Sequence, residues 1–102
     1  MLGLARLRVV GETKYSKEEL AAVVVEHLKR RLSEIGQQVN ELEKTINDLE
    51  ERYGVSWEVF EEKFKKGNLA EEADLDYIEW QASMELLKEL RRERDQLMEV
   101  LG

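Results

Sequence analysis

Apolar residues between positions 21 and 53 recur at alternating spacings of four and three. This is the heptad repeat of a coiled coil, whose a and d positions face a partner helix. Because no Pro interrupts the segment and Gly54 stands where a helix C-cap belongs, the pattern predicts one long helix over 16–53. At 1.5 Å per residue it would be about 55 Å long, so it needs a long partner. The a and d positions, which we name the heptad seam and predict to be an interface, are Val25, Leu28, Leu32, Ile35, Val39, Leu42, Ile46 and Leu49.

The start of this helix has its own signal. Ser16 and Glu19 form a capping box, in which the Ser hydroxyl accepts from the amide of Glu19 and the Glu side chain reaches back. Gly36 lowers the helix propensity of this segment, because Gly is a weaker helix former than Ala by about 1 kcal/mol. The heptad continues in phase across Gly36, which favours one helix over two.

A short helix is predicted at 56–66, where the chain must turn. Ser56 can cap its start, and Gly67 with Asn68 can end it. Its aromatic residues share one face and should pack against the long helices. They are Trp57, Phe60 and Phe64.

A second long helix is predicted at 71–101, with acidic residues in its first turn and basic residues later, as the helix dipole favours. We expect an aliphatic seam along it, widened by four larger side chains. The seam residues are Leu75, Ile78, Ala82, Leu86, Leu90, Leu97 and Leu101, and those that widen it are Tyr77, Trp80, Met84 and Leu87. The fold class that follows is all-α: a single domain over 1–102 forming a long antiparallel helical hairpin, or coiled coil, with a short helix at the bend.

The N-terminal arm, 1–15, alternates apolar and polar residues over 4–10, which is typical of a short β-strand. The run 20–25 is apolar around the whole helix, so it should be contacted on two sides. Residues 4–10 and a second protein chain are alternative sources of that contact. With the length of the heptad seam, this leads us to expect a helical-bundle homodimer.

Composition narrows the class of protein. At 42% hydrophobic and 38% charged residues, the chain is too apolar for disorder and suits long helices with narrow seams. It has no Cys, and its longest apolar run is far short of the ~20 residues of a membrane span. We therefore expect a cytoplasmic protein without a membrane partner, and the many Glu, Lys and Arg residues favour a thermophilic source.

Charge divides the chain unequally. Residues 1–32 hold seven Lys or Arg against four Asp or Glu, whereas 33–102 hold nine against nineteen. The acidic part favours a basic partner protein. The basic part suggests an alternative function, a dimeric DNA-binding regulator in which a paired strand enters the major groove. Its candidate nucleic-acid contacts are Arg6, Arg8, Lys29, Arg30 and Arg31.

The sequence contains few candidate catalytic or metal-binding residues. His27 is the single His, and one His without Cys cannot build a common zinc site. The spacings Glu58 to Glu61 and Asp76 to Glu79 could imitate the paired carboxylates of Mg²⁺-dependent helical nucleotide pyrophosphohydrolases, a less favoured alternative. With 23 acidic residues, such spacings also arise by chance. We predict no enzyme and no cofactor.

Residues 49–69, from Leu-Glu-Glu-Arg-Tyr-Gly-Val-Ser-Trp to Lys-Gly-Asn-Leu, are followed by an acidic stretch and Trp80. This succession, over roughly 40–95, resembles small prokaryotic, mainly archaeal, proteins of toxin–antitoxin type. The resemblance implies an antitoxin-like protein that wraps and blocks a basic toxin, commonly a ribonuclease. The leading hypothesis is thus a non-catalytic, dimeric interaction protein that occludes its partner.

Overall fold

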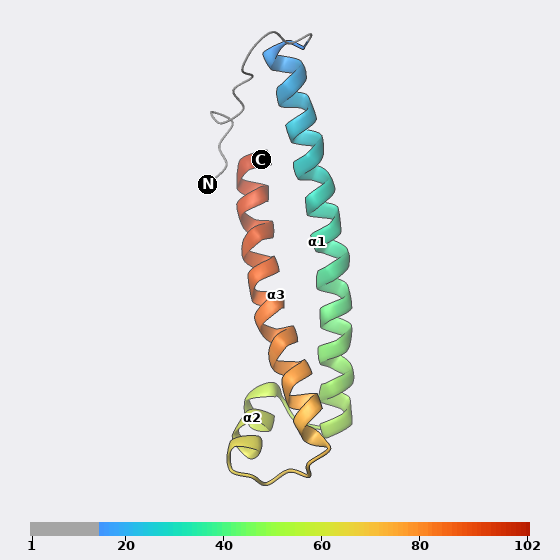
Figure 1. Cartoon of the computed structure of the whole chain (residues 1–102), viewed down its shortest axis with the longest axis vertical. Helices are drawn as coiled ribbons and strands as arrows, with labels where there is room; N and C mark the ends of the chain where they lie inside the picture. Colours follow the sequence, from blue (N-terminus) through green and yellow to red (C-terminus); the bar gives the residue numbers. More distant parts are fainter. Residues whose placement is uncertain (1–14) are drawn as a thin grey trace.

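Three helices and no strand make up the described part of the chain, residues 15–102 of a computed structural model (Figure 1). The first and last helices run antiparallel as a hairpin, and the short helix lies at the bend. The strand expected over 4–10 and the arm 1–15 fall almost wholly outside the described residues. The all-α hairpin with a short helix at its bend is confirmed.

Helix α1 spans Lys17–Tyr53 without interruption at Gly36, as the heptad predicted. The Ser16 hydroxyl accepts a hydrogen bond from the Glu19 amide at 3.1 Å, which satisfies one of the free N–H groups of the first turn. Gly54 ends the helix in the left-handed conformation, φ 67°, and its amide donates to the Glu50 carbonyl at 2.7 Å. Both predicted ends are therefore confirmed by their cap geometry.

Helix α2 spans Trp57–Lys65 and helix α3 spans Ala73–Leu101. The Ser56 hydroxyl accepts from the Val59 amide at 3.4 Å and so caps α2 as expected. Helix α3 begins two residues later than the acidic run predicted, since residues 71 and 72 form a turn. The boundaries of the three helices otherwise agree with the sequence to within a residue.

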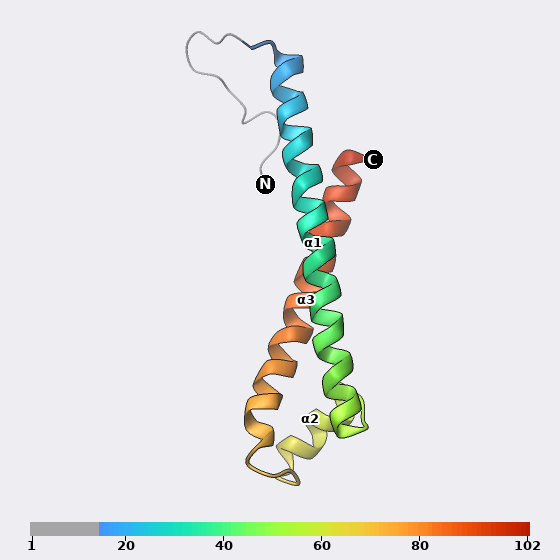
Figure 2. The ribbon, with the colours of Figure 1, turned by 90° about the vertical axis from the view of Figure 1, so that its right-hand side faces the viewer.

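The hairpin is long and thin, with extents of 65 × 21 × 20 Å. Viewed from the side, α1 and α3 cross at a shallow angle, and α1 continues beyond the end of α3 (Figure 2). None of the helices within residues 15–102 has an apolar stretch long enough to cross a membrane.

An aromatic cluster fills the bend. Phe60 of α2 and Trp80 of α3 are fully buried, with their ring centroids 4.8 Å apart. Tyr53 packs on Phe60 at 4.5 Å, and Phe64 stacks on Tyr77 at 3.8 Å. The prediction that the aromatic face of the short helix packs against the long helices is confirmed for these contacts. The cluster fixes α2 against one side of α3.

The face that α3 turns toward α1 differs from the predicted seam. Trp80 is buried and Leu90 is buried as expected, but Ile78 and its neighbours on the seam are exposed. Residues two positions apart point to nearly opposite sides of a helix, so burying Trp80 turns Ile78 outward. An indole side chain buries far more apolar surface than an aliphatic side chain, which explains why α3 packs with its aromatic face toward the core. The buried residues of α3 are Ala73, Trp80, Ser83, Leu87 and Leu90, and the predicted seam residues found exposed are Leu75, Ile78, Ala82 and Leu86.

Candidate functional site

Within residues 15–102, the heptad seam has a part that the hairpin buries and a part that it does not bury. Four residues of its C-terminal part lie buried in the core of the hairpin, and Leu42 packs beside them. By contrast, no residue between 17 and 34 is buried, and Val25 is 37% exposed. Leu28 and Leu32 are half-buried. The buried seam residues are Ile35, Val39, Ile46 and Leu49.

The division follows from the lengths of the helices. Helix α1 has 37 residues and α3 has 29, so α3 cannot cover the whole seam (Figures 1 and 2). The Arg31 guanidinium of α1 donates two hydrogen bonds to Glu93 of α3, at 2.7 and 2.9 Å. These bonds hold the pKa of the Glu93 carboxyl below its usual value, against a smaller opposing effect of burial. Toward its N-terminus α1 continues beyond the end of α3, and no residue between 17 and 34 is buried (Figure 1).

A second polar contact fastens the two helices at the bend. The Tyr53 hydroxyl donates to Asp76 Oδ2 at 2.5 Å, and Arg52 forms a salt bridge with Asp76 Oδ1 at 2.9 Å. The Tyr53 hydrogen bond is the main cause of a lowered pKa at Asp76, which Arg52 lowers further. Burial, followed by the bond to Asp76, raises the pKa of Tyr53 to about 12. Asp76 is therefore a structural anion of the hairpin.

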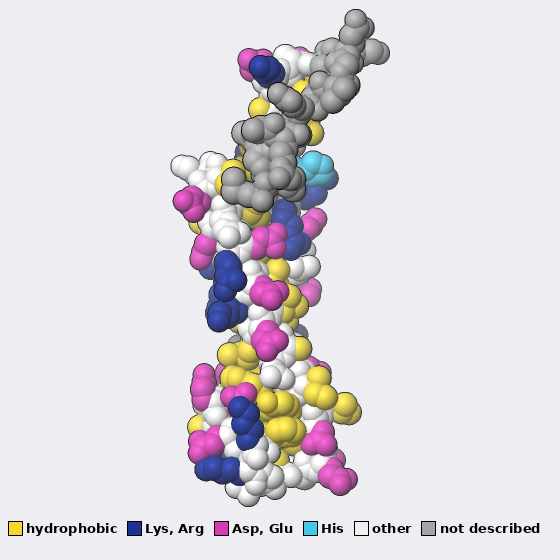
Figure 3. Space-filling model, turned by 60° about the vertical axis from the view of Figure 1, so that its left-hand side comes forward, with side chains coloured by type: hydrophobic (Ala, Val, Ile, Leu, Met, Phe, Trp, Pro, Cys, Tyr) yellow, Lys and Arg dark blue, Asp and Glu magenta, His cyan; other side chains and the backbone are white. Residues whose placement is uncertain are grey.

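Helix α3 carries a second exposed apolar surface, which we name the α3 stripe: Leu75, Ile78, Ala82 and Leu86. Three of its members are 77%, 61% and 46% exposed, in the order Leu75, Ile78, Leu86. Figure 3 shows hydrophobic side chains gathered on the surface near the α2 end of the hairpin. The sequence identified these residues but placed them in the core, because their spacing alone cannot tell a buried stripe from an exposed one. The acidic residues beside them are the feature of the sequence that could have indicated an exposed position.

The candidate nucleic-acid residues are only partly described. Arg6 and Arg8 lie outside residues 15–102. Lys29 and Arg30 are exposed, with Lys29 Nζ 3.8 Å from Glu26, whereas Arg31 is engaged by Glu93. DNA binding stays a prediction.

Of the four carboxylates whose spacing resembles that of a metal site, two form contacts within the hairpin. Asp76 binds Tyr53 and Arg52, and Glu61 accepts a long hydrogen bond of 3.5 Å from Tyr77. Among residues 15–102, no three His, Asp or Glu side chains stand close enough to hold one metal ion together. Glu58 and Glu79 are exposed.

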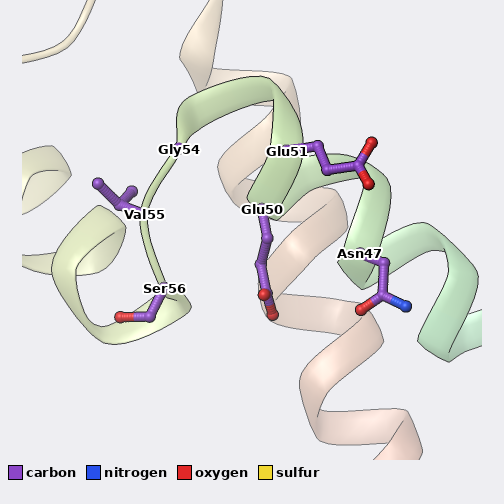
Figure 4. Close-up of a pocket in the computed structure, with 6 residues that line it drawn as sticks. All are labelled: Asn47, Glu50, Glu51, Gly54, Val55 and Ser56. Atoms are coloured by element: carbon purple, nitrogen blue, oxygen red, sulfur yellow. The ribbon is translucent and has the colours of Figure 1, made fainter.

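A shallow hollow lies beside the end of α1 (Figure 4). Asn47, Glu50 and Glu51 border it from α1, and Val55 and Ser56 from the connecting segment. The side chains of Val55 and Ser56 point away from those of the three α1 residues. Because Ser56 caps α2 and the polar groups do not converge, this hollow lacks the features of a catalytic site.

Comparison with known proteins adds no relative. The chain matches no family model, no curated protein and no solved structure. Within residues 15–102, the N-terminal part of α1 and the α3 stripe are helix faces on which several exposed or half-buried apolar residues follow one another. Exposed apolar side chains that lie next to one another on a protein surface are typical of contacts with another chain.

Proposed function

We propose that this protein is a non-catalytic interaction module that self-associates along α1 and, in an antitoxin-like role, binds and occludes a basic partner protein. One observation carries the proposal: the heptad seam of α1 continues beyond the part that α3 covers. Val25, Leu28 and Leu32 keep the a and d spacing of a coiled coil, yet none is buried.

A second copy of the chain is the occupant that best fits the uncovered part of α1. A coiled-coil surface is complementary to another helix with the same spacing, and an identical helix supplies it. The apolar run 20–25 widens this surface around the helix. Association would hide Val25 and its seam neighbours, which stabilises the pair by about 25 cal/mol per Å² of apolar surface removed from water.

The charge of the rest of the molecule supports a basic partner. Residues 33–102 carry nineteen acidic against nine basic side chains, and most of the acidic ones are exposed. A surface of one sign accelerates encounter with a partner of the opposite sign and rejects partners of the same sign. Occlusion of a basic toxin, the role that the resemblance to antitoxins implies, would use this charge.

Sedimentation equilibrium tests the self-association. We expect a dimer that Leu28→Asp dissociates, because the substitution puts a charge into the part of the heptad seam that the hairpin leaves half-exposed. Ser33→Asp is the matched control, since Ser33 is exposed and lies outside both the a and d positions and the apolar run 20–25. A monomer at all concentrations, or equal effects of both substitutions, would contradict self-association through α1.

The antitoxin-like role is tested with the product of the neighbouring reading frame. We expect a basic ribonuclease that forms a stable complex with this chain and loses RNA cleavage in it. Full cleavage in the presence of excess chain would exclude this role and leave the self-association to be judged by its own experiment.

A further inference from the structure

The α3 stripe lies on a side of the hairpin that α2 leaves bare. The aromatic residues of α2 pack on Tyr77 and Trp80; Trp80 leaves α3 on nearly the opposite side from Ile78, and Tyr77 leaves it about 100° around the axis from Ile78. The stripe residues follow one another at three and four positions, so they form one continuous surface three turns long. At 1.5 Å per residue, the distance from Leu75 to Leu86 along the axis is about 17 Å. A helix of similar length could lie along it.

The stripe continues into a groove between α3 and α1. Leu86 and Leu90 line this groove from α3, and Leu42 lines it from α1 together with polar neighbours. Leu42 and Leu90 also pack in the hairpin core, so the floor of the groove is held by buried contacts. An apolar side chain of a docked helix would find its pocket there.

Acidic side chains surround the stripe. Four of them stand three or four positions from a stripe residue within α3 and are therefore its neighbours on the helix surface, and Glu71 lies in the turn just before the helix. All are exposed, and none forms a salt bridge within the described part of the chain. We name them the acidic rim: Glu71, Asp74, Glu79, Glu85 and Glu89.

The rim decides between two occupants. A second copy docked stripe to stripe, in either orientation, would bring two rims of the same sign together, and such a juxtaposition opposes binding. A helix with apolar residues on one face and Lys or Arg on both flanks would cover the stripe and neutralise the rim. This is the mode in which an amphipathic helix recognises a groove.

We propose that the α3 stripe and its acidic rim are the docking surface for a basic amphipathic helix of the partner protein. The proposal rests on the proposed interaction function and names the surface and the partner element that this function would use. It separates two surfaces: α1 for a second copy and α3 for the partner. Docking would add a third long helix to the hairpin.

A designed peptide of about five helical turns serves as the probe, with Leu at seam positions and Lys on the flanks. A second peptide has the same Leu residues and Glu on the flanks. We expect the dye-labelled Lys peptide to bind in fluorescence anisotropy and the Glu peptide to bind at least about tenfold more weakly. Equal binding of the two peptides would show that the rim does not select the occupant.

The matched variants are Ile78→Glu in the stripe and Val59→Glu on α2. Both side chains are exposed, and both substitutions add one negative charge. Attraction between opposite charges alone predicts that each strengthens binding of the Lys peptide, whereas docking on the stripe predicts that Ile78→Glu weakens it by at least about tenfold. Equal effects of the two variants would overturn the proposal, and circular dichroism confirms that both retain their helices.

Sedimentation separates this proposal from the proposed function. If Ile78→Glu dissociated a dimer that Leu28→Asp left intact, the stripe would be a contact between copies and the docking proposal would be wrong. If the Lys peptide bound as expected to a chain that stays monomeric, self-association through α1 would fail while the docking surface stood.

Discussion

The Tyr53 hydroxyl donates a hydrogen bond of 2.5 Å to Asp76 Oδ2, joining the last turn of α1 to the first turn of α3. Both helices have other contacts along their length, but this bond lies where the chain reverses direction. It therefore fixes the register of the hairpin next to the aromatic cluster.

Removal of this hydroxyl should weaken the hairpin. Tyr53→Phe keeps the ring contact with Phe60 and loses a hydrogen bond to a charged acceptor, which contributes about 1.5–3 kcal/mol in proteins. We expect the free energy of unfolding in urea to fall by an amount in this range. Tyr77→Phe is the control, because its bond to Glu61 is 3.5 Å long and should contribute less. Equal losses would mean that the Asp76 contact has no special role.

Acid should destabilise the hairpin through two carboxylates. The pKa values of Asp76 and Glu93 are lowered from their ordinary values of 3.8 and 4.5, first by the hydrogen bonds from Tyr53 and from Arg31 respectively. Below these ordinary values the unfolded chain binds more protons than the folded one, so the unfolding free energy falls as the pH is lowered. Urea titrations at a series of pH values should show stability that is complete above about pH 5 and lost below it.

Asp76→Asn should make this acid dependence shallower, since one of the two lowered pKa values is removed. Asp48→Asn is the matched control, because Asp48 is exposed and forms no salt bridge within residues 15–102. The same change in slope for both variants would contradict the assignment of acid sensitivity to Asp76.

Alkaline conditions act through Tyr53. Burial, and then the bond to Asp76, raises its pKa from 10.0 to about 12. The folded chain thus keeps a proton that the unfolded chain releases, so this contribution to stability is complete below pH 10 and lost as the pH rises through 12. Ultraviolet titration should show a tyrosinate component near pH 12 that is absent from Tyr53→Phe. Its persistence in that variant would contradict the assignment.

Two glycines should respond to alanine in opposite ways. Gly36 lies within α1 with no atom within 4 Å of an added Cβ, so Gly36→Ala should stabilise the protein by about 0.5–1 kcal/mol. Gly54 has φ 67°, a conformation that costs an L-residue about 1–2 kcal/mol, so Gly54→Ala should destabilise it. Shifts of the thermal midpoint in the same direction would contradict this interpretation.

Local signals made most of the fold predictable from the sequence. The caps at Ser16, Ser56 and Gly54 depend on residues within one turn, and the structure has them where the sequence placed them. The rotation of α3 about its axis could not be predicted from local signals, because it depends on whether Trp80 or the aliphatic stripe is buried in the core. For the same reason, the sequence did not predict that the α3 stripe is exposed. Which part of α1 lies beyond α3 depends on how the two helices are placed along each other, which the local sequence does not determine.

Substitutions on the two sides of α3 test which side is buried in the core. Trp80 is fully buried among Tyr53, Trp57 and Phe60, so Trp80→Ala should lower the free energy of unfolding by about 3–5 kcal/mol. Ile78 is 61% exposed, and Ile78→Ala should change it by less than about 0.5 kcal/mol in the monomer. Urea denaturation at low protein concentration compares the two. A large loss for Ile78→Ala with a small one for Trp80→Ala would mean that α3 is turned the other way, with the aliphatic stripe facing α1 as its spacing first suggested.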